Sequence, residues 1–396
     1  IIDSLKKQYA EMNNPKKGLA YTILGDPLQA LNMIYPHRDI GSLDINDEKE
    51  RKILFGKTGL SRLMLYKPKT KNKFSYKDST ITNFGRIFSF EKIGNYSSKI
   101  KSILESIKKS TGIVFIYSQY IDGGAVPMAL ALEEMGITRY GSNSLFEHAP
   151  HPPINYKTMK EFSKNESSKF PAKYIMITGD KNLTPNTREQ LKGITSENNT
   201  NGEIVKVVIV TRAGSEGLDF KNIREMHIMD PWYNYNRQKQ IMGRAIRNLS
   251  HCKLPYEERN CSIYLYGTEL LNNEVEAADL YIYRLAEKKA LQMAKVSRIL
   301  KEVSVDCLLN NDALNFSQKN INVVVEQKLS NGKIINFHIG DKENSDMCDF
   351  TTCAYTCKPD NKLNDIINDQ TYNEGFIIMN LDKILQRIRS LFKEQY

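Results

Sequence analysis

Cysteine, tryptophan and long apolar runs are all scarce in this sequence of 396 residues, and each scarcity narrows the class of protein. Six cysteines, all in the second half, are too few for a disulfide framework in a chain of this length, so we expect a reducing, intracellular compartment. No apolar run approaches the roughly 18 residues that a membrane span requires, so we expect no membrane partner. The first residues are polar and lysine-rich, unlike a secretory signal.

Basic residues outnumber acidic ones moderately, 56 Lys and Arg against 46 Asp and Glu, which leaves a net charge of +10. A basic balance favours polyanionic partners such as nucleic acid, although this charge is spread along the whole chain. The length is sufficient for two or three domains with apolar cores.

From Ile100 onward, short apolar segments alternate with helical patterns. The segments that predict strands are 112–118, 174–178, 205–211, 226–230 and 262–267. The main helical patterns between them are 126–136, 185–191 and 236–247. Short apolar strands that alternate with helices are typical of an α/β protein with a mostly parallel sheet. Ligands of such sheets bind at the carboxyl ends of the strands.

The segment Thr211–Asp219 lies at such an end and contains a hydroxyl residue, a Gly-rich turn and a carboxylate. A hydroxyl group and free backbone N–H groups suit a nucleic-acid phosphate. The Asp219 carboxylate suits either a ribose hydroxyl or the arginines of the motif that follows.

That following motif is Gln240-x-x-Gly243-Arg244-x-x-Arg247. On a continuous helix, Gln240, Arg244 and Arg247 would share one face. Guanidinium groups fork onto phosphate oxygens, and an arginine beside a γ-phosphate stabilises the transition state of hydrolysis. Gly243 would let a ligand or a neighbouring element approach closely. The plainer interpretation is a surface helix with solvated arginines.

Four short sequence motifs lie at or after the ends of predicted strands. They are Tyr117–Gln119, Ile177–Asp180, Thr211–Asp219 and Gln240–Arg247. In this order and spacing they resemble the second RecA-like lobe of superfamily 2 helicases and translocases. The segment Asp230–Asn234, which holds the single tryptophan Trp232, resembles a segment of Snf2-related translocases.

This resemblance implies roles for the matching residues. The catalytic residues that it implies are Gln240, Arg244 and Arg247, with Arg247 as the main arginine finger. The nucleotide-binding residues that it implies are Gly217, Asp219 and Gly243. The residues expected to contact DNA or RNA are Ser118, Gln119, Thr178 and Thr211. ATP with Mg²⁺ is the implied cofactor.

A longer resemblance extends from about Ala30 to Tyr396. Its clearest segments are Ala30–His37, Tyr117–Ser142, Tyr281–Asn310 and Cys348–Pro359. They are similar to helicases of nucleocytoplasmic large DNA viruses, a group that includes the small subunit of the poxvirus early transcription factor and poxvirus nucleoside triphosphate phosphohydrolase I. The resemblance implies a function in viral transcription. It also implies viral RNA polymerase or transcription-factor subunits as partners, and a location in the virion and the host cytoplasm.

The chain departs from this pattern in its first part. The triplet Gly56–Thr58 is not a P-loop, because a P-loop requires glycine where Arg51 stands, and no apolar strand precedes it. Asp47-Glu48 likewise follows no strand. We therefore expect the ATP phosphates and Mg²⁺ to be held mainly by a first lobe upstream, and this chain alone not to hydrolyse ATP. The alternative is a non-catalytic scaffold or transcription-factor subunit, and a P-loop and Asp-Glu box upstream in the gene would decide for the enzyme.

The cysteines near the carboxyl end are a candidate metal site. Cys348, Cys353 and Cys357 could bind zinc, with His338 or Cys307 as a fourth ligand. The alternative is three reduced, partly buried thiols.

The predicted fold is therefore a RecA-like α/β domain with a mostly parallel sheet, followed by an α+β accessory region with a β-hairpin at 322–340, where Asn331–Gly332 predicts a tight turn. The predicted divisions are a connector to a first lobe at 1–95, the RecA-like lobe at 96–270, a long helix at 271–305 and the accessory region at 306–396. The last of these ends in an amphipathic helix and is expected to be truncated.

Overall fold

The computed structural model describes residues 24–67, 73–141, 144–162, 170–185, 187–212, 218–270, 276–307, 324–338, 342–358 and 374–395. The chain divides into two compact units, the first comprising 1–293 with 324–337 and the second 294–323 with 338–396. The domain limits predicted from the sequence stay predictions.

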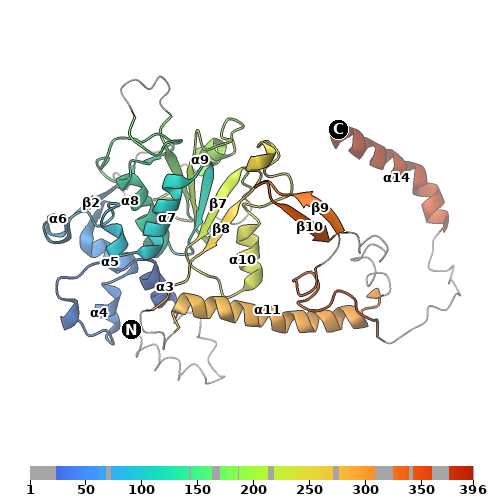
Figure 1. Ribbon diagram of the computed structural model, residues 1–396, viewed down its shortest axis with the longest axis horizontal. Coiled ribbons are helices and arrows are strands. Elements are labelled where there is room, and N and C mark those ends of the chain that lie inside the picture. The colour runs from blue at the N-terminus through green and yellow to red at the C-terminus, as the bar shows by residue number, and fades with distance from the viewer. Residues whose placement is uncertain are drawn as a thin grey trace. The chain divides into compact units, whose positions relative to one another are not determined.

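A six-stranded parallel sheet forms the centre of the first unit (Figure 1). The strands are, in their order across the sheet, β4 (Thr138–Arg139), β5 (Lys173–Ile177), β6 (Val207–Val210), β3 (Ile113–Tyr117), β7 (Ile223–Ile228) and β8 (Ser262–Leu265). This arrangement confirms the predicted RecA-like α/β fold. The central strands read as continuous apolar runs because both of their faces are covered.

The central strand β3 shows how the two faces are covered. Val114 and Ile116 belong to one buried cluster together with apolar side chains of α7 (Ser98–Lys109) and α8 (Val126–Glu134). Phe115 and Tyr117 belong to a second cluster, to which α9 (Thr187–Ile194) contributes Ile194 and α10 (Tyr235–Met242) contributes Ile241. Successive side chains of a strand point to opposite faces, so each face of the sheet receives its own helices.

The segment before the sheet contains several short elements. They are α3 (Gly25–Asn32), η1 (Ile40–Ser42), α4 (Glu48–Lys52), α5 (Gly56–Leu63), the hairpin β1 (Met64–Lys67) and β2 (Lys73–Tyr76), α6 (Asp78–Phe84) and η2 (Ile93–Asn95). Tyr35, Phe88 and Ile93 of this segment are fully buried in the same cluster as α7 and α8. The segment is therefore part of the first unit, and its predicted role as a connector to another lobe stays a prediction.

The triplet Gly56–Thr58 begins α5. Gly56 has a φ of +57°, and the element before it is helix α4 rather than a strand. The arrangement agrees with the interpretation that this triplet is not a P-loop.

A buried carboxylate anchors the polar segment that follows β4. Glu133, on α8, accepts hydrogen bonds from the backbone N–H of Phe146 at 2.8 Å and from the hydroxyl of Tyr174 at 2.7 Å. Burial raises the pKa of Glu133, while these hydrogen bonds favour its charged form. Leu145 and Phe146 are consequently part of the core, although the surrounding sequence is polar.

The remaining elements of the chain are the π-helix η3 (Ile121–Ala125), η5 (Tyr256–Glu258), α11 (Ala278–Val303), β9 (Val324–Lys328), β10 (Ile334–His338) and α14 (Glu374–Gln395). Strands β9 and β10 pair as the predicted hairpin, and Gly332 in its turn has a φ of +82°. Neither α11 nor α14, nor any other helix in the described ranges, is long and apolar enough to cross a membrane.

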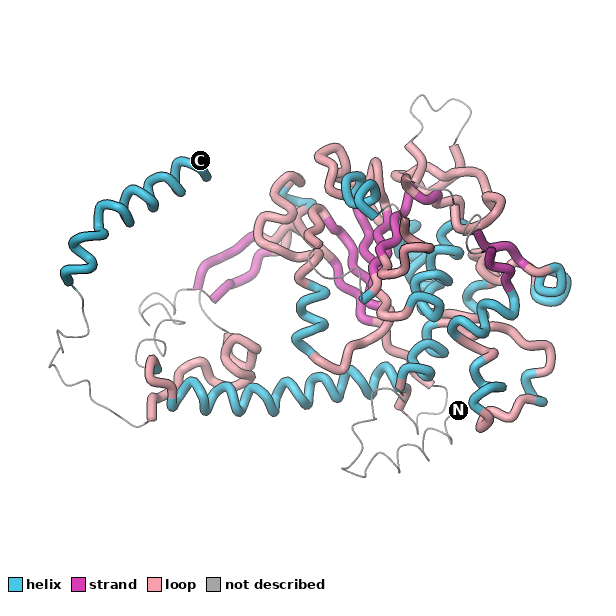
Figure 2. The backbone as a smooth tube through the Cα atoms, turned by 180° about the vertical axis from the view of Figure 1, so that it is seen from behind, coloured by secondary structure: helices cyan, strands magenta, loops and turns pink. Residues whose placement is uncertain are grey.

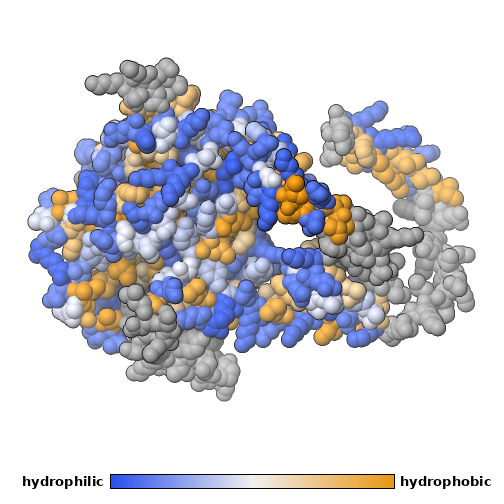
Figure 3. All heavy atoms as spheres, in the orientation of Figure 1, coloured by the Kyte–Doolittle hydropathy of each residue, from blue (hydrophilic) through white to orange (hydrophobic). Residues whose placement is uncertain are grey.

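In the second unit, the segment 342–358 lies along the carboxyl half of α11. Arg298 of α11 donates hydrogen bonds to the carbonyl oxygens of Cys348 at 2.8 Å and Thr352 at 2.7 Å, and its Nε lies 3.1 Å from Asp349 Oδ2. The helix α14 carries an exposed apolar stripe, which Figure 3 shows in orange. Its residues are Ile378, Leu381, Ile384, Leu385, Ile388, Leu391 and Phe392.

The cysteines of the second unit form disulfides, which corrects two predictions. Cys307 is bonded to Cys357 and Cys348 to Cys353, with Cα–Cα distances of 5.8 and 4.6 Å that suit disulfides. The zinc site predicted at Cys348, Cys353 and Cys357 is therefore wrong, as is the alternative of reduced thiols. Among the described residues no group of three or more potential ligands could hold a metal ion. The sequence spacing could not show which thiols meet, because one pair is 50 residues apart.

This pairing predicts the number of free thiols. The unreduced protein, unfolded in denaturant, should present two reactive thiols, those of Cys252 and Cys261. A chromogenic thiol reagent measures this number, and the same sample after reduction should give all six cysteines as its control. Six thiols without reduction, or about one equivalent of bound zinc, would contradict the pairing.

Candidate functional site

The residues predicted to contact nucleic acid gather where neighbouring strands of the sheet end. Ser118 and Gln119 follow β3, Thr178 follows β5, Thr211 follows β6, and Asp230 follows β7. These strands are adjacent in the order β5-β6-β3-β7, so their carboxyl ends lie side by side (Figure 1, Figure 2). The structure therefore brings together residues that lie more than 100 positions apart in the sequence.

Asp230 is the centre of a buried hydrogen-bond network at this edge. Its carboxylate accepts hydrogen bonds from Ser118 Oγ at 2.6 Å, Gln119 N at 2.8 Å and Asn32 Nδ2 at 2.8 Å. The side chain is 1% exposed, and this burial raises the pKa of Asp230, whereas the three hydrogen bonds favour its ionised form. Asp230 thus connects the ends of β3 and β7 with the end of α3.

A buried ion pair extends this network to α11. Lys99 Nζ, on α7, lies 2.8 Å from Asp279 Oδ2, at the start of α11, and donates to the carbonyl of Met229 at 3.2 Å. Thr268 Oγ1 donates to the same Asp279 oxygen at 2.7 Å. Both charged side chains are almost inaccessible, 3% for Lys99 and 0% for Asp279. A pair this deeply buried holds α7 and α11 in a fixed register through its hydrogen bonds.

The hydroxyl groups predicted to contact nucleic acid are buried. Ser118 donates to Asp230, Thr178 Oγ1 lies 3.2 Å from Thr184 Oγ1, and Thr211 is 1% exposed. Gln119 is only partly buried, and its Nε2 donates to the carbonyl of Pro231 at 3.1 Å. The roles of these four residues in nucleic-acid binding stay predictions. A ligand at this edge would meet backbone groups and the loops after the strands before it met these hydroxyls.

The helix predicted to run through Arg247 ends earlier. Helix α10 ends at Met242, so the prediction that Gln240, Arg244 and Arg247 share one continuous helical face is wrong. After Met242 the backbone makes tighter bonds, with Arg244 N donating to Ile241 O at 3.0 Å. Such three-residue bonds are common where an α-helix ends, and glycine at position 243 weakens its continuation.

The two arginines nevertheless converge on one short segment. Arg244 Nη1 donates to the carbonyl of Leu218 at 2.9 Å, and Arg247 Nε lies 3.4 Å from Asp219 Oδ1. Of the two partners considered for Asp219, the structure shows the arginine. The Gly-rich turn at 213–217, including Gly217, lies outside the described residues. Gln240 is exposed on α10 and Gly243 lies at its end.

Arg247 and Asp219 remain accessible to solvent. Their side chains are 44% and 53% exposed, so water screens the attraction between them and the pair adds little stability. The guanidinium of Arg247 is therefore free to exchange the carboxylate for a stronger anion, such as a phosphate oxygen, at low energetic cost.

Cations and aromatic rings are interleaved beside this edge. The guanidinium of Arg212 lies 5.0 Å from the ring centre of Trp232, Trp232 stacks on Tyr233 at 5.0 Å, and Lys289 Nζ lies 5.5 Å from the ring centre of Tyr233. Stacked aromatics with basic neighbours are a composition that single-stranded nucleic acids bind. The sequence analysis identified Trp232 but missed Arg212 and Lys289. The alternation becomes visible only when α11 is placed beside the sheet.

The site fits part of an ATP complex. Two guanidinium groups that converge on one short segment suit the oxygens of a polyphosphate. Mg²⁺ prefers carboxylate oxygens, and the described residues contain no cluster of three or more acidic, histidine or cysteine side chains. The described part of this chain therefore supplies two neighbouring arginines and no complete metal site.

Comparison with known proteins finds a helicase domain in one part of the chain and similarity to viral helicases. Residues 152–249 match the helicase conserved C-terminal domain, a stretch that includes β5, β6, β7 and α10 with both arginines. Among solved structures, the C-terminal part of the Fun30 ATPase domain is similar over 47% of this chain and 44% of that chain, with 11% identity and a TM-score of 0.30. That likeness is too low to support an argument.

The similar curated proteins are viral. A protein of Invertebrate iridescent virus 3 named as a helicase is 24% identical over 66% of this chain and 23% of its own length. The Termination factor NPH-I homolog of African swine fever virus is 27% identical over 55% of this chain and 34% of its own length. A protein of Acanthamoeba polyphaga mimivirus named as an ATP-dependent RNA helicase is 28% identical over 44% and 26%. The chain thus spans a quarter to a third of these relatives.

The buried pair of Lys99 and Asp279 predicts a large loss of stability. Lys99→Met should lower the free energy of unfolding by about 3–5 kcal/mol, because it leaves the Asp279 carboxylate buried without its cation. Urea unfolding followed by the fluorescence of Trp232, the single tryptophan, measures this change.

Lys253→Met is the matched control, because Lys253 pairs with Glu197 at the surface. It should leave the unfolding midpoint nearly unchanged. If the midpoint of Lys99→Met moves no further than that of the control, the network does not have the structural role described above.

Proposed function

We propose that this chain, which carries a helicase conserved C-terminal domain and is similar to helicases of large DNA viruses, is the second lobe of an ATP-dependent nucleic-acid helicase or translocase. The observation that carries the proposal is the convergence of Arg244 and Arg247 on Leu218 and Asp219, in the segment that leads into β7. This arrangement offers exposed guanidinium charge to a phosphate that another part of the protein holds.

In this proposal ATP and Mg²⁺ are held mainly by a first lobe, and ATP hydrolysis supplies the free energy for movement along nucleic acid. Arg247 leaves Asp219 and binds the γ-phosphate, where its fixed charge stabilises the transition state. Arg244 keeps its hydrogen bond to the carbonyl of Leu218 and so fixes the distance between the turn that carries Arg244 and the segment at Leu218. Gln240 and Asp219 connect the nucleotide with the nucleic acid.

The nucleic acid, DNA or RNA, would cross the carboxyl edge of the sheet. There it would meet the loops after Thr178 and Thr211, together with the aromatic and basic group of Arg212, Trp232 and Lys289. The names of two similar proteins, a termination factor and an RNA helicase, support a function in viral transcription. Viral RNA polymerase or transcription-factor subunits are the partners that such a function implies, and the virion and host cytoplasm are its location.

A non-catalytic scaffold is the second candidate. The observation that favours it is the use of Ser118 and Asp230 in a purely internal network. In that case the fold serves to bind a partner, and Arg247 has no effect on hydrolysis by the longer protein.

The two candidates predict different results for Arg247→Ala. In a longer protein that contains the first lobe, this change should lower the kcat of ATP hydrolysis by about 10³-fold or more, because an arginine finger contributes that much. Nucleic-acid affinity should change less than about threefold, since the contacts of the strand ends remain. Steady-state hydrolysis and fluorescence anisotropy measure the two quantities.

Arg389→Ala is the matched control, because it also removes an exposed arginine charge but lies on α14. It should leave both quantities unchanged. Hydrolysis by Arg247→Ala at the rate of the unchanged protein would refute the catalytic role and support the scaffold.

A further inference from the structure

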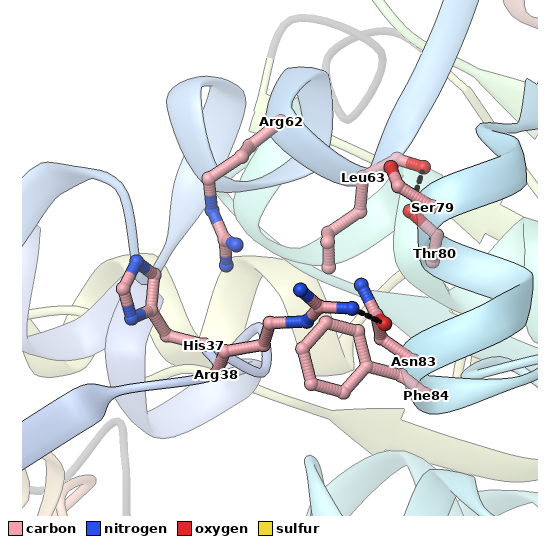
Figure 4. Close-up of a pocket in the computed structure, with 8 residues that line it drawn as sticks. All are labelled: His37, Arg38, Arg62, Leu63, Ser79, Thr80, Asn83 and Phe84. Atoms are coloured by element: carbon pink, nitrogen blue, oxygen red, sulfur yellow. Dashed lines mark hydrogen bonds between the residues drawn. The ribbon is translucent and has the colours of Figure 1, made fainter.

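A small polar recess lies in the first unit, away from the sheet edge, between the segment after α3 and the helices α5 and α6 (Figure 4). Its volume is about 180 Å³. The polar residues that line it are His37, Arg38, Arg62, Ser79, Thr80 and Asn83, and Leu63 and Phe84 form its apolar wall. Nothing in the proposed helicase mechanism uses these residues.

Neither arginine of this recess is neutralised. Arg38 Nη2 donates to the amide oxygen of Asn83, and Arg62 donates to the carbonyl oxygens of Pro36 and Ile53. All of these acceptors are uncharged, and no described carboxylate forms an ion pair with either guanidinium. A guanidinium has five N–H donors, so both arginines retain donors for a ligand. Figure 4 shows both groups facing the same space.

The other polar groups of the recess also present donors. The Asn83 oxygen is occupied by Arg38, so its amide N–H groups remain. His37 Nδ1 accepts a hydrogen bond from the backbone N–H of Asp39 at 3.2 Å, so the proton of the ring lies on Nε2. Ser79 adds a hydroxyl, whereas Thr80 donates its own to the carbonyl of Leu63 at 2.7 Å. A recess lined by two cations and mostly by hydrogen-bond donors selects an anion.

Burial makes an anion more favourable still. Burial lowers the pKa of Arg62, which means that the surroundings penalise its charge and that a bound anion would relieve this penalty. The recess is smaller than the roughly 300–1,000 Å³ of pockets that enclose whole small molecules. It can therefore hold a single tetrahedral anion but not a complete nucleotide. Forked guanidinium donors match the oxygens of phosphate.

We propose that this recess binds one phosphate group of a nucleic-acid strand, with the attached sugars and bases outside it. That the phosphate belongs to a nucleic-acid strand rests on the proposed function, because the surface of a helicase lobe meets the phosphate backbone of its substrate. Arg38 and Arg62 grip the phosphate oxygens, and Asn83 and Ser79 supply neutral hydrogen bonds. The recess would be a second contact that fixes the register of the strand on this lobe.

Titration of the full chain with inorganic phosphate and with single-stranded DNA tests the site, using calorimetry for the first and anisotropy for the second. Arg38→Ala should weaken both affinities about tenfold, because it removes a charged hydrogen-bond donor. Ser79→Glu should abolish phosphate binding by placing a carboxylate beside the arginines, and it leaves both arginines in place. Arg389→Ala, on α14, should behave like the unchanged chain.

Arg62 also donates hydrogen bonds to two backbone carbonyls, so Arg62→Ala would remove contacts that support the fold. Arg62→Lys, which keeps a positive charge at this position, is therefore the variant used to test Arg62. A DNA strand with a 5′-phosphate and the same strand without it identify the source of the group. If Arg38→Ala weakens the affinity for both strands equally, the recess binds an internal phosphodiester. If it weakens the affinity for the 5′-phosphorylated strand alone, the recess binds the terminal phosphate.

Two results would overturn the proposal. One is that Arg38→Ala and Ser79→Glu both bind phosphate with the same affinity as the control Arg389→Ala. The other is that these two variants lose phosphate binding but bind single-stranded DNA with unchanged affinity. The test of Arg247 uses different residues and a different readout, so the recess and the arginine finger can fail separately.

Discussion

The buried carboxylate of Asp230 is the constraint on which the arrangement of the carboxyl edge depends. A charged group with 1% exposure is stable only when hydrogen bonds replace its lost water, and Ser118, Gln119 and Asn32 supply three of them. These donors come from the end of one strand and from α3, so satisfying Asp230 also fixes the position of both elements. The pair of Lys99 and Asp279 continues this arrangement to the start of α11.

The two arginines lie elsewhere, in the turns after α10, where Ser250 and His251 make hydrogen bonds with the start of β7. Arg247 is about half exposed, and its Nε lies 3.4 Å from the half-exposed Asp219 carboxylate and donates to the carbonyl of Gly243 at 3.2 Å, so both of its partners are accessible or local. The structure thus separates two tasks. Buried polar groups set the geometry, and solvent-exposed guanidinium groups are left for ligands. The recess around Arg38 and Arg62 repeats the second task at a different place, with donors that no carboxylate of the described ranges neutralises.

Some interpretations of the sequence were wrong because they assumed local regularity. A period of 3.6 residues placed Gln240, Arg244 and Arg247 on one helix, yet α10 ends at Met242, and the arginines meet Leu218 and Asp219 through turns. The cysteines near the carboxyl end were a candidate zinc site, but Cys307 and Cys357 meet across 50 residues. Two hydroxyls expected to contact nucleic acid, those of Ser118 and Thr178, make internal hydrogen bonds, and their role toward a ligand stays a prediction.

The sequence by itself determined the α/β class, the parallel sheet and the helicase resemblance. Apolar strands covered on both faces leave a continuous hydrophobic pattern, and the arginine and glycine motifs are local in the chain. Only the tertiary structure decided that Asn32, Ser118 and Asp230 share one network, that Arg212 and Lys289 flank the two aromatic rings, and that Arg38 and Arg62 face one recess. These groups lie far apart in the sequence, and no periodic pattern records a contact made by single side chains on different elements. Their meeting depends on how strands and helices pack, which is a property of the whole fold.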